Sequence, residues 1–393
     1  MIVRNPVKDQ VAIVGVGTTP FARSLPGRTG PSLALEAARL AILDAGLEAA
    51  DIDGIAASAM AYYGSAGANP LFLQEALGIP ETTWDATVAI PFPYLLSAAV
   101  NAVFSGACTT ALVVHSLYRV AVSQSAASDP FRARAVPAYV GPRPWGMGSD
   151  GYASFATRYI HDYGATKEDF GLIAINDRSH ASHNPHAVMR DPITMDDYLA
   201  ARIVRWPLGL LDMDLPIDGA DAIVVTTGER ARELSHKPVY VHAITSGRTE
   251  HPNVTNLESL EHNAQHVVLD ALWRKSDLAL RDFDLFFAYD GFTVITLNWI
   301  ENAGWCKKGE AGDFLREHWD ATAGIARIDG RIPMNTHGGN LSEGATQGAG
   351  HVREAVVQLR GDAGERQVEG VPSSALLLLG GMYMNAIGTV LRT

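Results

Sequence analysis

Short apolar runs alternate with amphipathic stretches along the chain, and this pattern predicts buried strands covered by helices. The first half opens with a buried strand at Val11–Gly17 and a helix at Ser32–Gly46. The segment from Asp51 leads into a second strand, and a nearly uncharged helix at Pro93–Phe104 precedes another buried strand at Cys108–His115. Strands and helices in this alternating order are typical of an α/β unit.

The second half of the chain shows the same order of elements. Its strands and helices are predicted at Pro238–Gly247, Glu261–Ser276, Leu280–Tyr289, Val352–Arg360, Ala375–Gly380 and Met382–Leu391. A repeated order of strands and helices indicates two similar units. We therefore predict an α/β protein with two similar βαβαβ halves, residues 1–236 and 237–393, packed as one body.

A long excursion interrupts the first half at residues 116–215. It carries many charges together with Pro–Arg–Pro–Trp, Asn–Pro and Asp–Pro sequences, which favour loops. Helices are predicted within it at Gly151–Tyr163 and Lys167–His183. Because long excursions in compact domains usually serve function, we expect a functional loop domain over one face.

The stretch Asn335–His351 is rich in glycine and lies directly before a predicted helix. Glycine lets the backbone approach a ligand closely or adopt positive φ. The N–H groups at the start of the helix would suit an anion or a developing oxyanion. The alternative is a tight loop that needs glycine for packing alone.

The hydrophobic content, net charge and cysteine count of the chain indicate which classes of protein are not expected. The chain has 393 residues, 47% of them hydrophobic, with a formal net charge of −12, so a nucleic-acid role is not expected. Cys108 and Cys306 are too few and too far apart for a disulfide framework. We find no signal-peptide pattern and no run of about 18 apolar residues, so we expect a cytoplasmic protein without a membrane span.

Seven short motifs stand in a specific order along the chain: Val11–Pro20, Ile193–Tyr198, Pro207–Asp212, Asp218–Ala222, Tyr289–Phe292, Asn335–Gly348 and Gly380–Gly381. This set resembles the thiolase superfamily over essentially the whole chain. The resemblance is strongest to the lipid-transfer-protein (SCP-x-like) branch and its thiolase-related aldolases. It implies a thiolase fold with a five-layer αβαβα body, a homodimer, and a coenzyme A thioester as substrate, with no cofactor bound by the chain.

The chain departs from the thiolase pattern where thiolases place their catalytic groups. The nucleophilic cysteine of the family would fall near Ala89, and the second cysteine corresponds to Leu378. The Gly–His–Pro motif becomes Gly344–Ala345–Thr346, so its histidine is lost. The residue that begins the family's Asn–Glu–x–Phe motif is Tyr289.

A thiolase-shaped pocket without a thiolate can still break a C–C bond by retro-aldol chemistry. A base removes the proton of a β-hydroxyl, and hydrogen-bond donors stabilise the resulting thioester enolate. The resemblance implies that Tyr289 carries a proton and that aldolases have a second tyrosine where Ala345 stands, so Asp290, His337 and Glu343 are candidate replacements. The substrate-binding candidates are Gly338, Gly339, Gly344, Ala345, Gly380 and Gly381. The alternative for Tyr289 is a core tyrosine whose hydroxyl is hydrogen-bonded.

Two other functions stay open. An acetyl-CoA acetyltransferase would need Cys108 or Cys306 as nucleophile, and Lys307 and Lys308 could lower the pKa of Cys306. A non-catalytic scaffold or lipid-binding subunit is also possible, because fold does not imply function. The resemblance further implies a small DUF35-type partner with an OB fold and a zinc ribbon.

Two further features of the sequence concern a possible metal site and the assembly of the protein. His180, His183 and His186 are spaced by three, but Pro185 breaks the helical register, so no metal site is predicted. The apolar strand Cys108–His115 is expected at an exposed sheet edge, where pairing with a second copy across a two-fold axis would cover it.

Overall fold

The computed structural model describes residues 5–58, 68–88, 92–118, 149–250, 260–382 and 386–393. Nine strands of this described part form one mixed sheet. Their order is β3 (Trp84–Val88), β2 (Gly54–Ser58), β4 (Thr110–Tyr118), β7 (Asp218–Thr227), β1 (Val11–Thr18), β8 (Val239–Gly247), β14 (Ala386–Arg392), β13 (Ser374–Leu379) and β9 (Leu285–Ala288).

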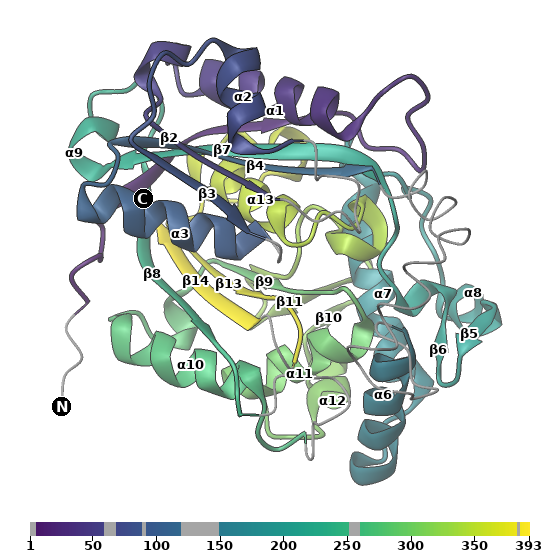
Figure 1. Cartoon of the computed structure of the whole chain (residues 1–393). Helices are drawn as coiled ribbons and strands as arrows, with labels where there is room; N and C mark the ends of the chain where they lie inside the picture. The colour runs from purple at the N-terminus through teal and green to yellow at the C-terminus, as the bar shows by residue number, and fades with distance from the viewer. Residues whose placement is uncertain (1–4, 59–67, 89–91, 119–148, 251–259, 383–385) are drawn as a thin grey trace.

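Two half-sheets meet at β1 and β8, and helices separate them elsewhere (Figure 1). The β1–β8 register has only two residue pairs, Ala12 with Tyr240 and Ile13 with Val239. Helices α1 (Gly30–Asp44) and α10 (Ala264–Lys275) each cover the outer face of one half-sheet. Helices α3 (Phe92–Ser105) and α13 (Ala349–Arg360) lie between the half-sheets and contact strands of both. The predicted five-layer αβαβα body is therefore confirmed.

The two halves have the same topology. In the first half β1 and β7 are antiparallel, β7 and β4 are antiparallel, and β4 and β2 are parallel. In the second half the pairs β8–β14, β14–β13 and β13–β9 repeat these directions. The parallel β2–β3 pair is reduced in the second half to a single bridge between Phe286 and Met334. The predicted internal repeat is thus present, although β3 and helix α2 (Pro70–Leu77) were not predicted.

The described part of the loop excursion packs against α11 (Thr293–Ala303), α12 (Ala311–Glu317) and the glycine-rich loop of the second half. It contains α6 (Ser149–Tyr163), α7 (Lys167–Ser182), α8 (Met195–Ala200), β5 (Ile203–Arg205) and β6 (Leu208–Gly209). The two helices predicted there match α6 and α7. The remaining described α-helices and strands are α9 (Gly228–Ala231), α11 (Thr293–Ala303), α12 (Ala311–Glu317), β10 (Trp319–Asp320), β11 (Ile325–Ile328) and β12 (Ile332–Pro333).

Buried Asp212 holds the excursion to the body. Its carboxylate accepts hydrogen bonds from Lys167 of α7, Tyr198 of α8 and Thr293 of α11, at 2.6, 2.6 and 2.8 Å. The backbone N–H of Gly209 adds a fourth donor at 2.7 Å. A buried carboxylate with this many donors fixes the position of every element that supplies one.

The Gly15–x–Gly17 pair of β1 serves packing. A Cβ atom at Gly17 would lie 2.3 Å from the carbonyl oxygen of Ala37, and one at Gly15 would lie 2.2 Å from that of Ala41. Helix α1 therefore rests directly on the backbone of the strand. This close packing explains why glycine occupies both positions.

The exposed edge of the first half-sheet is not the strand that the sequence suggested. The expectation that Cys108–His115 forms an edge is wrong, because β4 lies between β2 and β7. The apolar residues of β4 are buried by these neighbours and by helices, so they do not need a second copy of the chain to cover them. Among the described strands, β3 forms that edge, and its residues alternate between half-buried and exposed.

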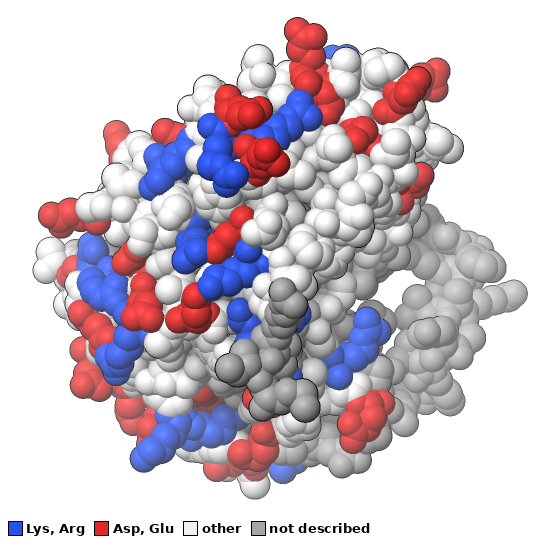
Figure 2. All heavy atoms as spheres, turned by 90° about the vertical axis from the view of Figure 1, so that its left-hand side faces the viewer, with Lys and Arg blue, Asp and Glu red and all other residues white. Residues whose placement is uncertain are grey.

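Two surface observations bear on partners. Among the helices that the structure describes, none is long and apolar enough to cross a bilayer. On the face shown in Figure 2, Lys and Arg side chains lie among Asp and Glu side chains instead of forming one basic stripe. That face therefore lacks the concentrated positive charge typical of nucleic-acid binding.

Candidate functional site

The glycine-rich loop folds against α7 and the end of β9. Gly338 and Gly339 have φ values of 98° and 61°, a left-handed conformation that favours glycine. A Cβ atom at Gly339 would lie 2.0 Å from Oδ2 of Asp290, and one at Gly338 would lie 2.5 Å from Cβ of Ala181. These two glycines let the loop approach the protein's own carboxylate and helix, which supports the packing interpretation for them.

The other substrate-binding candidates are also buried. Gly344 has a φ of 146°, and a Cβ atom there would lie 2.7 Å from Ile217. The N–H of Ala345 donates to the carbonyl of Leu215 at 2.9 Å. Gly380 accepts a hydrogen bond from the indole of Trp299 at 3.1 Å, and Gly381 follows it. At the start of α13, the N–H groups of Ala349 and Gly350 donate to Thr346, so this residue takes two of the expected anion-binding donors.

Asp290 lies at the centre of the site, two residues after the end of β9. Its fully buried carboxylate accepts hydrogen bonds from the N–H of Leu341 at 2.9 Å, the amide of Asn340 at 3.1 Å and Nε2 of His351 at 3.1 Å. Burial alone would raise the pKa of Asp290, but the hydrogen bond and charge of His351, with the other donors, hold it below its usual value.

Two histidines stand side by side behind Asp290. The ring centroids of His337 and His351 are 4.5 Å apart and the rings are nearly perpendicular. Burial, and then the neighbouring His351, lower the pKa of His337 well below its usual value, so its imidazole is neutral at pH 7. Within the described chain, Nδ1 of each histidine has no hydrogen-bond partner. A neutral imidazole with a vacant nitrogen can accept or donate a proton.

Tyr289 directly precedes Asp290 in the chain, and its ring belongs to the same buried cluster. Only 6% of its surface is exposed, and its ring stacks on His351 with centroids 6.0 Å apart. Its N–H donates to the carbonyl of Leu378 at 2.9 Å, so Tyr289 lies beside the position that corresponds to the family's second cysteine. A Cβ atom at Gly291 would lie 2.6 Å from the Tyr289 ring, so this glycine gives the ring its space.

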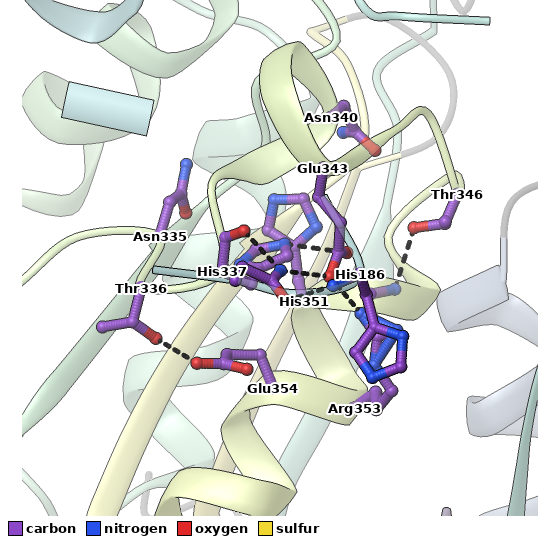
Figure 3. A network of polar contacts seen from close by, with 12 residues as sticks. His186, Asn335, Thr336, His337, Asn340, Glu343, Thr346, His351, Arg353 and Glu354 are labelled. Carbon is purple, nitrogen blue, oxygen red and sulfur yellow. Dashed lines mark hydrogen bonds and ion pairs between the residues drawn. The ribbon is translucent and has the colours of Figure 1, made fainter. Parts of the chain in front are cut away.

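Glu343 is held by a buried row of charges at the far end of the loop (Figure 3). Its Oε1 accepts from Arg353 at 2.6 Å and from Asn184 at 2.7 Å, and its Oε2 lies 4.0 Å from Nε2 of His337. Arg353 also donates to Asp221 of β7 at 3.0 Å. Burial raises the pKa of Asp221 to about 6. The row links the glycine loop to the first half-sheet through α13.

The structure thus brings Tyr289, Asp290, His337 and Glu343 into one connected cluster. Sequence reasoning missed the neighbours Asp177, Asn184, His351 and Arg353, which complete the cluster. A signal for Asp177 was available, because Asn176–Asp177–Arg178 places three polar residues in a row in a helix, and all three are buried. His351 is the last residue of the glycine-rich stretch Asn335–His351, so its position in the sequence was a signal as well.

The three evenly spaced histidines do not form a metal site. His180 and His183 line a cavity of about 310 Å³ with Ser179, Arg327, Thr336 and Arg366 among other residues. His186 is not among the residues that line it. Within the described ranges, no group of three or more His, Cys, Asp or Glu side chains could hold a metal ion.

The cysteines are not activated. Burial, followed by the charges of Glu301 and Glu310, raises the pKa of Cys306 to about 12. The charge of Lys308 lowers this pKa, as the sequence suggested, but burial and the two carboxylates outweigh it, so the pKa is raised overall. Lys308 donates to Asn298 at 2.6 Å and lies 3.4 Å from Glu301. Burial, and then Asp53, likewise raise the pKa of Cys108 to about 12.

Comparison with known proteins identifies the family. The family described as "Thiolase C-terminal domain-like" matches residues 246–393. The "17-hydroxy-3-oxo-4-pregnene-20-carboxyl-CoA lyase" of Mycobacterium tuberculosis is 33% identical, with 95% of this chain and 100% of that protein covered. The "Steroid side-chain-cleaving aldolase" of Thermomonospora curvata is also 33% identical, with 93% and 97% covered.

A solved structure of an aldolase has a fold similar to that of this chain. The "Ltp2-ChsH2(DUF35) aldolase" has a TM-score of 0.86 and 31% sequence identity, and the match covers 98% of both chains. The chain therefore belongs to the thiolase superfamily and is similar to its lipid-transfer and thiolase-related aldolase members. The resemblance that the motifs indicated is confirmed.

Glu354 on α13 accepts a hydrogen bond from the glycine-rich loop, and the contribution of Glu354 to stability depends on pH. Its carboxylate accepts from Thr336 at 2.9 Å, Gln358 at 3.0 Å and Arg366 at 2.8 Å. Burial opposes ionisation, but the charge and hydrogen bonds of Arg366 lower the pKa of Glu354 to about 2. A lowered pKa contributes stability above pH 4.5 that is lost as the pH falls toward 2.

We predict that Glu354→Gln destabilises the protein at pH 7 by about 1–3 kcal/mol, because Arg366 loses its charged partner. Urea unfolding at pH 7, 5 and 3.5 measures this. The gap to wild type should narrow at pH 3.5, where the wild-type contribution has begun to disappear. Glu369→Gln, at an exposed glutamate that lines the cavity of His180 and His183, is the control. A gap that does not change with pH would contradict the assignment.

Proposed function

We propose that this protein is a carbon–carbon lyase that cleaves a bulky β-hydroxyacyl-CoA by a retro-aldol reaction. The observation that carries the proposal is the buried cluster of Tyr289, His351, Asp290 and His337, side chains that are chemically able to carry protons. Cys108 lies in the connection between α3 and β4 and Cys306 in the connection after α11, and burial raises the pKa of both thiols. The names of the two relatives, a lyase and an aldolase acting on steroid side chains, favour a steroid side-chain thioester.

The reaction needs one base and one acid. A base removes the β-hydroxyl proton, the O–H electrons form the new C=O bond, and the Cα–Cβ bond breaks. Its electron pair becomes a thioester enolate, which takes a proton at Cα. The products are a ketone or aldehyde and a shorter acyl-CoA, so neither water nor an oxidant is consumed.

Tyr289 is assigned as the residue that exchanges the proton with the substrate. An ordinary phenol with a pKa of about 10 is a poor base at neutral pH, so the surrounding groups must assist it. His351 stacks on its ring and is itself anchored by Asp290. This chain has Ala345 where aldolases carry a second tyrosine, and we assign the second proton carrier to neutral His337, with Glu343 beside it.

The acyltransferase alternative requires a thiolate to hold the acyl group. Cys108 packs against Gly54 at the amino end of β2, and Cys306 follows α11 beside Glu301, so neither belongs to the Tyr289 cluster. A non-catalytic scaffold would not explain why several ionisable side chains are gathered around Tyr289. Both alternatives are therefore less well supported than the lyase.

We predict that Tyr289→Phe lowers kcat on 17-hydroxy-3-oxo-4-pregnene-20-carboxyl-CoA by roughly 10²–10⁴-fold with little change in KM, because a proton carrier acts in the transition state. Product formation is measured with any required partner present. Tyr240→Phe, a half-buried tyrosine of β8, is the control and should keep full turnover. Turnover that survives in Tyr289→Phe would remove this phenol from the mechanism. Equal losses of activity and stability would instead make it a core residue.

Assembly forms part of the proposal. We propose a homodimer that pairs β3 with its copy, because β3 is the exposed edge of the first half-sheet. A DUF35-type partner is proposed because the similar aldolase structure is named as a complex with one. A cytoplasmic location is proposed as well, and the two free cysteines are compatible with it.

Sedimentation at micromolar concentration should show a dimer of the wild-type chain. Thr87→Asp should weaken that dimer, because Thr87 and Asp85 are the exposed residues of β3 and like charges would meet across the two-fold axis. Thr322→Asp, on the turn between β10 and β11, is the control and should remain dimeric. A wild-type monomer under these conditions would exclude the proposed dimer.

A further inference from the structure

Asp177 is a buried carboxyl group for which the retro-aldol reaction has no direct use. It lies in the middle of α7 and is completely buried. Its Oδ1 accepts hydrogen bonds from the amides of Asn176 at 2.9 Å and Asn335 at 3.4 Å. No N–H or O–H group of the described residues donates to its Oδ2.

The carboxyl group of Asp290 lies beside that of Asp177 and interacts with it. Both carboxyls border the same point, because a Cβ atom at Gly339 would lie 2.0 Å from Oδ2 of Asp290 and 2.8 Å from Oδ2 of Asp177. Two ionised carboxylates this close and this deeply buried would repel each other strongly. A single proton between them removes the repulsion and gives the unpartnered oxygen a hydrogen bond.

The charged groups around Asp177 and Asp290 do not form an ion pair with either carboxyl that could take the place of the shared proton. Arg178 turns away toward Ser342 and the carbonyl of Asp191. Arg353 is committed to Glu343 and Asp221, and Arg366 to Glu354. The remaining titratable neighbours are His351, which contacts Asp290, and His337 and His180, whose pKa values burial lowers. No lysine or arginine therefore pairs with either carboxyl among the described residues.

We propose that Asp177 and Asp290 share one proton, and that Asp177 acts as a positioning residue that keeps Asp290 ionised toward His351. Protonated Asp177 donates to Asp290, which then has four donors: Asp177, Asn340, Leu341 and His351. The direction of the pKa shifts agrees, since burial and then Asp290 raise that of Asp177 while that of Asp290 is lowered.

This arrangement has a consequence for catalysis, which rests on the proposed function. The His351 ring lies between Asp290 and the ring of Tyr289. If Asp290 lost its ionised form or its position, His351 would lose its anchor. Asp177 would therefore affect proton transfer without touching the substrate.

The first test is independent of activity. If native Asp177 holds a proton that the unfolded chain has released, the native state binds one more proton than the unfolded state, and stability falls as pH rises. In Asp177→Asn the amide donates to Asp290 in place of the proton and cannot ionise. The ratio of the wild-type to the variant unfolding constant should then rise about tenfold per pH unit between pH 5 and 7.

Urea unfolding of the full-length protein measures the ratio, with Asp191→Asn as a control at an exposed aspartate. The control ratio should stay flat across this range. A flat ratio for Asp177→Asn would overturn the shared proton, whatever the enzyme's activity. The failure of the lyase proposal would leave this result unchanged, so the two failures are distinguishable.

The second test uses turnover of the thioester named above. Asp177→Ala should lower kcat by about 10–100-fold with KM little changed, because Asp290 loses a donor and two asparagine amides lose an acceptor. Asp177→Asn should restore most of the loss, as a neutral donor of the same shape. An asparagine variant as inactive as the alanine variant would show that the amide cannot replace the proton and would overturn the positioning role. Should the alanine variant fail to fold, the unfolding ratio of the asparagine variant still decides.

Discussion

The carboxylate of Asp290 is the acceptor on which separate parts of the chain converge. The glycine loop donates to it through Asn340 and Leu341, α13 through His351, and α7 brings Asp177 beside it. A buried carboxylate is costly unless donors surround it, so the loop must approach closely enough to supply them. The left-handed turn at Gly338 and Gly339 meets this need, since no side chain fits between the loop and the carboxylate.

The same constraint explains how a thiolase body can hold a different chemistry. The five layers bring the ends of β9, the glycine loop and α13 together, and they do so independently of the nucleophile. With both cysteines packed elsewhere, the groups left at this place are a phenol, two imidazoles and several carboxyls. Such groups move protons, which is what a retro-aldol cleavage requires.

The periodic pattern of the sequence predicted most of the sheet and the repeat, because buried strands and amphipathic helices leave strong local signals. It failed at β3, a strand of only five residues whose short pattern gives little signal. It placed β4 at an edge because the order of strands within a sheet leaves no mark in the local sequence. The ordered motifs located Tyr289, Asp290, His337 and Glu343. Asp177 and Arg353 were missed because they come from helices whose contact with the loop exists only in three dimensions.

The proposed C–C cleavage proceeds without a covalent bond between the substrate and the protein. The mass of the intact protein, acid-quenched during turnover of the CoA thioester, tests this. We predict an unchanged mass, and continued cleavage by a folded Cys108→Ala/Cys306→Ala variant. A stoichiometric acyl adduct on either cysteine, lost together with turnover when that cysteine is replaced, would contradict the lyase and favour an acyltransferase.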